Sequence, residues 1–141
     1  MEIRPFNRDD EAAVISLWDQ CELLRPWNDP KKDIERKLQV RPDLFLVGIV
    51  DGQIVATAMV GYEGHRGWIN YLAVSPAYQR RGFGREIMAA AETRLRECGC
   101  PKINLQVRTS NQHVIDFYRS VGYQMDDVVS LGKRLEVDDV N

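Results

Sequence analysis

The side chains best suited to chemistry in this sequence gather at one turn in the middle of the chain. Gly82 and Gly84 stand where a helix is expected to begin, and glycine lets backbone N–H groups come close to an anion. Arg80, Arg81 and Arg85 add positive charge at the same place, where the helix N-terminus is itself partly positive. The turn therefore predicts a binding site for an anionic group, with a diphosphate as its natural ligand.

Two familiar phosphate-binding motifs do not account for this turn. A Walker loop requires Gly-Lys followed by Ser or Thr, which the turn lacks. A dinucleotide-binding fingerprint requires a further glycine where this chain has Ile87. Because helix starts often contain a glycine, the Gly-x-Gly pair taken alone leaves an ordinary structural turn as the alternative interpretation.

The composition is that of a globular protein without a surplus of positive charge. The chain has 141 residues, of which 44% are hydrophobic and 28% are charged, the usual profile of one soluble domain. Its 19 Lys and Arg against 21 Asp and Glu give a formal net charge of -2. A general nucleic-acid binder would carry a basic surplus, so we expect no nucleic-acid partner, and any anion must be bound by a local cluster.

No segment indicates export or a membrane. The longest apolar stretches, 44–50 and 54–60, are far below the roughly 20 residues that span a bilayer. No basic-then-apolar signal segment opens the chain. The three cysteines are odd in number, and their spacing suits neither a disulfide framework nor a zinc site. We expect a cytoplasmic protein with reduced thiols, no membrane partner and no metal.

The hydrophobic pattern interleaves strands and helices in the order β-α-α-β-β-β-α-β-α-β-β. Asn7 offers an N-cap, Asp29-Pro30 starts a further helix, and Asp51-Gly52 is a hairpin turn. The order indicates the α/β (α+β) class: a single domain with a mixed, mostly antiparallel sheet and about four helices on both faces. The expected strands are 2–6, 44–50, 53–62, 68–74, 103–107, 123–127 and 128–135, and the expected helices are about 7–23, from 30, 82–98 and 111–121.

The helical periodicity also predicts which side chains face the core. These are Val14, Leu17, Trp18 and Cys21 on the first helix, and Ile87, Ala91 and Leu95 on the helix that follows the glycine turn. The acidic end of the chain, 136–141, has no such pattern and is expected to be a flexible tail.

Three segments in the expected order resemble the GNAT superfamily of acetyl-CoA-dependent N-acetyltransferases. Residues 79–84 (QRRGFG) fit the family's Gln/Arg-x-x-Gly-x-Gly/Ala signature, and residues 72–76 (LAVSP) resemble the strand and turn before it. Residues 111–123 resemble the Asn-x-x-Ala-x-x-x-Tyr-x-x-x-Gly-Phe element, with Val114 in place of the alanine. The resemblance covers nearly the whole chain. Segments 24–30, 64–67 and 130–135 look further like the small bacterial YpeA-type subgroup.

The resemblance implies where acetyl-CoA binds. Backbone amides of the glycine turn would hold the pyrophosphate, and backbone groups of a strand splayed by a bulge would pair with the pantetheine arm. Asn111 would contact the same arm, and Tyr118 would lie near the sulfur. The residues implied in binding are Leu72, Ala73, Val74, Gln79, Arg80, Arg81, Gly82, Phe83, Gly84, Arg85, Asn111 and Tyr118.

The resemblance also implies roles in acetyl transfer to an amine. The Leu72 amide would polarise the thioester carbonyl, and Tyr118 would assist the departing thiolate as an acid or hydrogen-bond donor. Many GNAT enzymes carry a glutamate base on the strand that here reads 68–71 (WINY), without a carboxylate. Glu63 and His65, in the loop before it, are the nearest candidates for a base, and loss of the amine proton to solvent is the alternative.

The acceptor itself is not identified by the sequence. The resemblance places the acceptor site beside the loop at 24–29, so Arg25, Trp27 and Asn28, together with Asn70, are the candidate contacts. A small-molecule amine, a peptide N-terminus and a lysine side chain all stay open, as does a homodimer. The alternatives to an enzyme are a catalytically weak CoA-binding or regulatory module of the same fold and an interaction domain unrelated to CoA.

Overall fold

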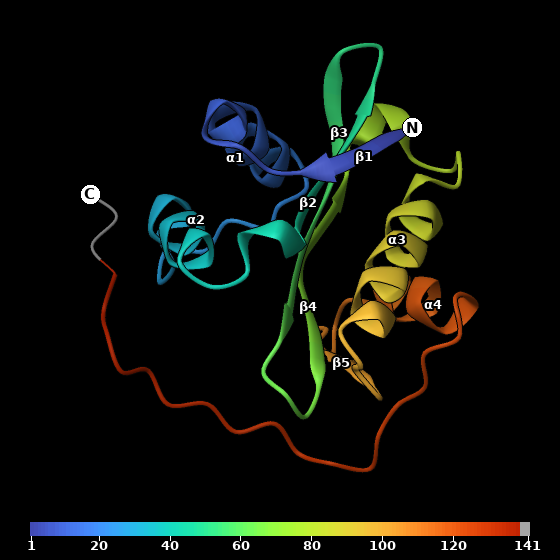
Figure 1. Cartoon of the computed structure of the whole chain (residues 1–141). Helices are drawn as coiled ribbons and strands as arrows, with labels where there is room; N and C mark the ends of the chain where they lie inside the picture. The colour runs from blue at the N-terminus through green and yellow to red at the C-terminus, as the bar shows by residue number, and fades with distance from the viewer. Residues whose placement is uncertain (139–141) are drawn as a thin grey trace. The chain divides into compact units, whose positions relative to one another are not determined.

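The computed structural model describes residues 1–138, which form two units (Figure 1). The first unit comprises Met1–Leu105 together with Asp138, and the second comprises Gln106–Val137. Of the tail expected at 136–141, residues 139–141 lie outside the described part of the chain. No helix in the described part combines the length and the hydrophobicity needed to span a bilayer.

The first unit is built on one sheet with the order β1-β2-β3-β4-β5. Neighbouring strands are antiparallel except for β4 and β5, which are parallel. Asp51 and Gly52 join β2 to β3 with positive φ at both positions, the geometry of the predicted hairpin turn. The strands are β1 Glu2–Pro5, β2 Phe45–Val50, β3 Gln53–Tyr62, β4 Gly67–Val74 and β5 Ile103–Leu105.

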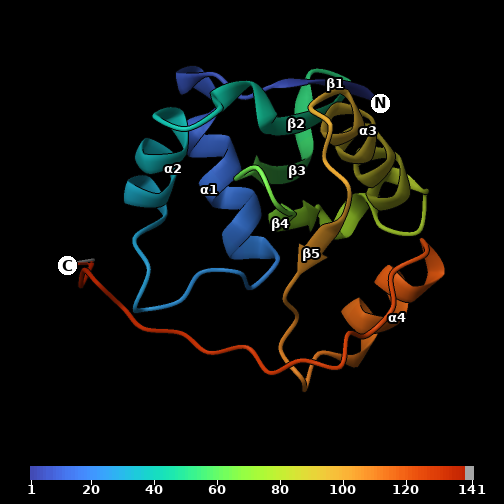
Figure 2. The ribbon, with the colours of Figure 1, turned by 60° about the horizontal axis from the view of Figure 1, so that its bottom comes forward.

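Helices lie on both faces of this sheet, as predicted. Helices α1 (Glu11–Gln20) and α2 (Pro30–Leu38) cover one face, and α3 (Phe83–Glu97) covers the other (Figures 1 and 2). Of the side chains predicted to face the core, Cys21 is half-buried, and the others are buried: Val14, Leu17, Trp18, Ile87, Ala91 and Leu95. The apolar side chains of these helices pack against the two faces of the sheet. Their burial removes them from water and so stabilises the fold.

The first helix is shorter than predicted at both ends. Asn7 does act as a cap, but it caps a short 3₁₀ turn at Arg8–Asp10 by accepting a hydrogen bond from the Asp9 amide. The helix ends at Gln20 because Glu22 adopts a left-handed conformation with φ of 59°. Two further 3₁₀ turns, Pro42–Leu44 and Pro76–Tyr78, precede β2 and follow β4.

The second unit contains α4 (Gln112–Ser120), near its predicted position. The two final strands predicted at 123–127 and 128–135 are wrong, because no strand is formed between residues 121 and 138 of the described chain. Val128, Leu131 and Leu135 are 79%, 92% and 91% exposed. An alternating apolar pattern favours an extended chain, but a strand also requires a partner that takes up its backbone hydrogen bonds, and the pattern does not supply one.

Asp138 departs from the expected flexible tail, because its carboxylate is buried against the start of α2. It accepts a hydrogen bond of 2.9 Å from the Asp29 amide and pairs with Arg36 at 2.7 Å. These contacts, Arg36 foremost, hold the pKa of Asp138 well below its usual range. The three cysteines, Cys21, Cys98 and Cys100, are free thiols in the structure.

Candidate functional site

Strand β4 carries a bulge at Tyr71 and Leu72. Thr57 pairs with Ala73 and Met59 with Asn70, so that one residue of β3 faces two residues of β4. Tyr71 adopts φ of 50°, a left-handed conformation that is rare for a bulky side chain. The bulge that the resemblance implied for this strand is therefore present.

The second half of β4 is unpaired on the side of β5. The parallel pairing of these two strands ends with Ile69 opposite Leu105, so residues 70–74 extend beyond it. Backbone N–H and C=O groups along such an edge can pair with an added extended chain. Leu72 and Ala73, which were predicted to contact a bound ligand, lie on this stretch.

Val74 differs from its neighbours on this edge, because its carbonyl already has two donors. The Gln79 side chain donates to it at 3.1 Å, and the Cys21 thiol donates at 3.3 Å. A ligand that pairs with the Val74 carbonyl would therefore compete with these donors, of which the Gln79 side chain is exposed.

The turn after β4 has the geometry of an anion site. Arg80 and Gly82 adopt φ of 64° and 81°, and α3 begins at the next residue, Phe83. The Gly82 carbonyl accepts a helical hydrogen bond from the Glu86 amide, and no side chain caps this helix N-terminus. The N–H groups of Phe83 and Gly84 precede that bond in the chain, so they lie at the end of the helix and point out of it.

The predicted basic residues lie in the turn and in the first turn of α3. Arg80, Arg81 and Arg85 are all exposed. The guanidinium of Arg81 lies 5.2 Å from the centre of the Tyr78 ring, which holds its charge beside the turn. Residues 79–85 thus form one turn at the start of α3, and their role in binding stays a prediction.

The two candidate bases lie elsewhere. Glu63 and His65 are exposed in the loop between β3 and β4. The Glu63 carboxylate accepts hydrogen bonds from the amides of His65 and Arg66, and so shapes its own loop. Gly67, where β4 begins, is five residues before Leu72, which corresponds to about 15 Å of extended strand. The structure does not bring Glu63 or His65 to the bulge.

The predicted acceptor contacts are spread over a loop and a strand. Trp27 is exposed, and Asn28 is half-buried beside it in the loop between α1 and α2. Arg25 is turned onto its own loop, where it donates to the carbonyls of Glu22 and Leu24. Asn70 is exposed on β4, at the start of the unpaired edge.

Asn111 and Tyr118 belong to the second unit. Asn111 is the residue before α4, and its side chain makes no capping hydrogen bond there. Tyr118 is buried and packs edge-on against the rings of Phe117 and Tyr123, at centroid distances of 5.3 and 5.7 Å. Burial raises the pKa of Tyr118 to about 12, so its hydroxyl keeps its proton at physiological pH.

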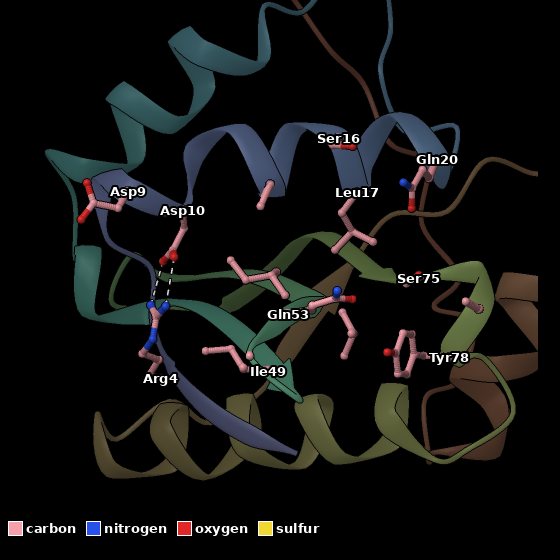
Figure 3. A pocket seen from close by; sticks show the side chains of 15 residues that line it. Arg4, Asp9, Asp10, Ser16, Leu17, Gln20, Ile49, Gln53, Ser75 and Tyr78 are labelled. Carbon is pink, nitrogen blue, oxygen red and sulfur yellow. Dashed lines mark hydrogen bonds and ion pairs between the residues drawn. The ribbon is translucent and has the colours of Figure 1, made fainter.

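A cavity of about 640 Å³ lies between α1, the β2–β3 turn and the 3₁₀ turn after β4 (Figure 3). Tyr78 and Ser75 line one end, and Arg4 and Asp10 line the other, joined by two hydrogen bonds of 2.7 and 2.9 Å. None of the predicted acceptor contacts lines this cavity. Within residues 1–138, no three His, Cys, Asp or Glu side chains are grouped as metal ligands.

One buried polar contact at the bulge was missed by the sequence analysis. The Thr57 hydroxyl of β3 accepts a hydrogen bond from the Trp18 indole N–H at 3.0 Å and donates to the Tyr71 carbonyl at 2.8 Å. Trp18 was predicted as ordinary core, and its burial is confirmed, but its N–H also serves this contact. The available signal was a single hydroxyl residue in the apolar run 54–60.

Comparison with protein families identifies the family to which the chain belongs. Residues 12–123, from α1 through the glycine turn and α4, match the family described as acetyltransferase (GNAT). The chain belongs to the GNAT acetyltransferase family. The resemblance carried by residues 72–84 and 111–123 is confirmed, and the GNAT protein is an enzyme of the acyltransferase class.

Bacterial relatives support the same assignment. An acetyltransferase of Yersinia pestis (strain Pestoides F) is 52% identical over 138 residues, which are 98% of each chain. An acetyltransferase of Pectobacterium atrosepticum is 53% identical over 135 residues, 96% of each chain. The alignments with these relatives cover nearly the whole GNAT protein, including residues outside the family match at 12–123.

A solved structure supports the fold. The structure of AAC(6')-Iy in complex with the bisubstrate analogue CoA-S-monomethyl-acetylneamine has a TM-score of 0.76 and covers 94% of this chain and 97% of that one. Its sequence identity is 19%, so this likeness concerns the fold alone. The predicted fold class, a mixed and mostly antiparallel sheet with helices, is confirmed for the GNAT protein.

Proposed function

We propose that this GNAT protein transfers an acetyl group from acetyl-CoA directly to a primary amine of a small molecule, a peptide N-terminus or a lysine. The observation that carries the proposal is the arginine-rich turn at the N-terminus of α3, directly after the bulged and partly unpaired β4. The fold neighbour AAC(6')-Iy, solved with an analogue that contains CoA, adds support for the coenzyme.

The residues present fit a CoA pyrophosphate. The turn presents amide N–H groups of residues 83–84, and Arg80, Arg81 and Arg85 add charge in a chain whose formal total is -2. Gln79 and the backbone of Leu72, Ala73 and Val74 complete the set we assign to the coenzyme. When bound, acetyl-CoA supplies an acetyl group activated as a thioester.

Two groups of the chain suit the chemistry of transfer. We assign the Leu72 N–H, on the unpaired stretch of β4, to the carbonyl oxygen of the thioester, where a donor stabilises developing negative charge. We assign the protonated Tyr118 hydroxyl to the departing sulfur, and Asn111 to the coenzyme arm. Both assignments in the second unit rest on the match of residues 111–123 to the family element.

The acceptor amine is proposed to lose its proton to solvent. Residues 68–71 of β4 contain no carboxylate, and Glu63 and His65 lie at the far end of that strand. Catalysis then rests on positioning the amine and the thioester rather than on a dedicated base. Arg25, Trp27, Asn28 and Asn70 stay our candidates for the acceptor contacts.

The lack of a base near the bulge also favours a second candidate, a CoA-binding or regulatory module with weak catalysis. One experiment separates the two. Purified protein is incubated with acetyl-CoA and pooled amines, amino acids and peptides, and mass spectrometry follows free CoA and acetylated products. Acetylated product with matching CoA release supports the enzyme, whereas acetyl-CoA binding without release against a broad panel supports the module.

A further inference from the structure

The backbone of Tyr71 is held in a conformation that it would not adopt unaided. Its φ of 50° places a bulky aromatic residue in the left-handed region, which favours glycine and asparagine. Such a conformation persists only where the surrounding contacts fix it. In Tyr71 both the backbone carbonyl and the side chain have such contacts.

The backbone carbonyl of Tyr71 is held from the neighbouring strand. Thr57 donates its hydroxyl proton to this carbonyl at 2.8 Å and accepts the Trp18 indole N–H at 3.0 Å. Thr57 and Trp18 are both completely buried, so the bond between them is shielded from water, whereas the bond to the Tyr71 carbonyl is partly buried. The chain of two hydrogen bonds connects α1 through β3 to the bulge of β4.

The side chain of Tyr71 is held from two helices. Its ring stacks on Trp18 of α1, with centroids 3.8 Å apart and planes 13° from parallel. Its hydroxyl donates to the Asp33 carboxylate of α2 at 2.6 Å, and Asp33 also pairs with Arg36 at 3.2 Å. Burial and the Asp33 carboxylate raise the pKa of the Tyr71 hydroxyl, which therefore stays a donor.

Losing these contacts would have a defined consequence. If Tyr71 returned to an extended conformation, the extra residue of β4 would be absorbed and the pairing with β3 would shift by one position. A one-residue shift in a strand reverses the direction of every following side chain and backbone group. The Leu72 N–H would then point away from the unpaired edge.

We propose that Thr57 is a positioning residue for acetyl transfer: with Trp18, Tyr71 and Asp33 it fixes the β4 bulge and so directs the Leu72 N–H. This inference rests on the proposed function, in which that N–H polarises the thioester. It goes further by assigning a role to a buried threonine that touches neither substrate nor coenzyme.

The test compares three substitutions in the full chain. Thr57→Val keeps the shape of the side chain and removes both hydrogen bonds, whereas Thr57→Ser retains the hydroxyl. Thr93→Val is the matched control, because the Thr93 hydroxyl is exposed and donates to the Ala89 carbonyl of its own helix. The readouts are the ¹H–¹⁵N resonance and hydrogen exchange of the Leu72 amide, and kcat and KM for acetyl-CoA.

We expect Thr57→Val to shift the Leu72 resonance, to slow the hydrogen exchange of this amide as it turns away from the unpaired edge, and to lower kcat by about 10-fold to 100-fold, with KM for acetyl-CoA changed less than about threefold. Thr57→Ser should recover most of the loss, and Thr93→Val should match the wild type. A Thr57→Val protein with an unchanged Leu72 amide and unchanged kcat would overturn the inference, as would Thr57→Ser being equally impaired.

Two outcomes need a separate reading. If the wild type shows no turnover with any amine, the proposed function fails, and the inferred role in transfer fails with it. The Leu72 amide still reports whether Thr57 fixes the bulge.

If Thr57→Val does not fold, the Tyr71→Phe variant tests the inference instead, since it removes only the bond to Asp33. A displaced Leu72 resonance with lowered kcat in Tyr71→Phe supports the inference, and wild-type values for both overturn it.

Discussion

At the scale of single residues, Tyr118 combines burial with a hydroxyl whose pKa is raised to about 12. Such a phenol donates a hydrogen bond and does not lose its proton near neutral pH. We expect Tyr118→Phe to lower kcat by about 100-fold while KM for acetyl-CoA changes little, because the hydroxyl acts on the leaving sulfur. Steady-state assays over a range of acetyl-CoA concentrations measure both constants.

Tyr62→Phe is the matched control, since the Tyr62 hydroxyl only bonds to the Gly64 and Gly99 carbonyls. It should behave as the wild type. An unchanged kcat in Tyr118→Phe, or equal losses in kcat and acetyl-CoA affinity, would remove Tyr118 from the transfer step.

A second residue-scale prediction concerns Asp10 and stability. Asp10 accepts two hydrogen bonds from Arg4 and one from the Asn7 amide, and Arg4 foremost lowers its pKa. A carboxylate whose pKa is lower in the folded state stabilises the fold above the unfolded value of about 3.9, and this stabilisation is lost as pH falls below it. We expect Asp10→Asn to cost about 1 kcal/mol at pH 7, because Arg4 is partly exposed.

Thermal unfolding of the wild type and of Asp10→Asn, followed by circular dichroism from neutral to acidic pH, measures this effect. The difference in Tm should shrink as pH falls through about 4. Asp9→Asn, at the exposed neighbouring carboxylate, serves as the control and should cost less. A difference in Tm that stays constant with pH would show that the Asp10 charge does not contribute.

At the scale of elements, β4 and α3 together form the proposed coenzyme site, because the strand ends shortly before the helix begins. The Gly82 turn joins them with φ of 81°, and a Cβ added there would meet no atom within 4 Å. We expect Gly82→Glu to fold, with about 1 kcal/mol of backbone strain, and to lose acetyl-CoA binding, since its carboxylate would repel the pyrophosphate. Isothermal titration with acetyl-CoA measures the binding.

Gly99→Glu provides a matched control at the other end of the same helix. Gly99 also has a positive φ, of 82°, and equally open space around its Cβ position. The Gly99→Glu substitution introduces the same side chain and the same kind of backbone strain as Gly82→Glu, but away from the Gly82 turn. Equal acetyl-CoA affinity in the two variants would show that the coenzyme does not bind at the N-terminus of α3.

At the scale of the whole molecule, the sequence patterns predicted the features that depend on residues close together in the chain, namely the helices, the first five strands and the glycine turn. Hydrophobic period and turn residues placed β1 to β5 and the helices within a few residues, and the string 79–84 located the turn. The final strands were wrong because pairing depends on a distant partner. The Thr57 contact was missed for the same reason, since Trp18 and Tyr71 lie 39 and 14 residues away in sequence.

The distribution of charge over the whole molecule explains how a chain with a formal net charge of -2 could bind the proposed, strongly anionic coenzyme. Three of its arginines gather at one helix N-terminus, so the local field differs in sign from the total. A coenzyme bound there contacts only the folded chain, and it should therefore stabilise the fold by mass action. This links the proposed site to a property of the entire protein.

Thermal unfolding with and without acetyl-CoA tests this account most directly. At about 100 times its dissociation constant, a ligand specific for the folded state adds about 2.7 kcal/mol. In a chain of this size that corresponds to a rise in Tm of about 5–10 °C. We predict this rise for the wild type and its absence in Gly82→Glu, whereas an unchanged Tm of the wild type up to millimolar acetyl-CoA would contradict the proposed function.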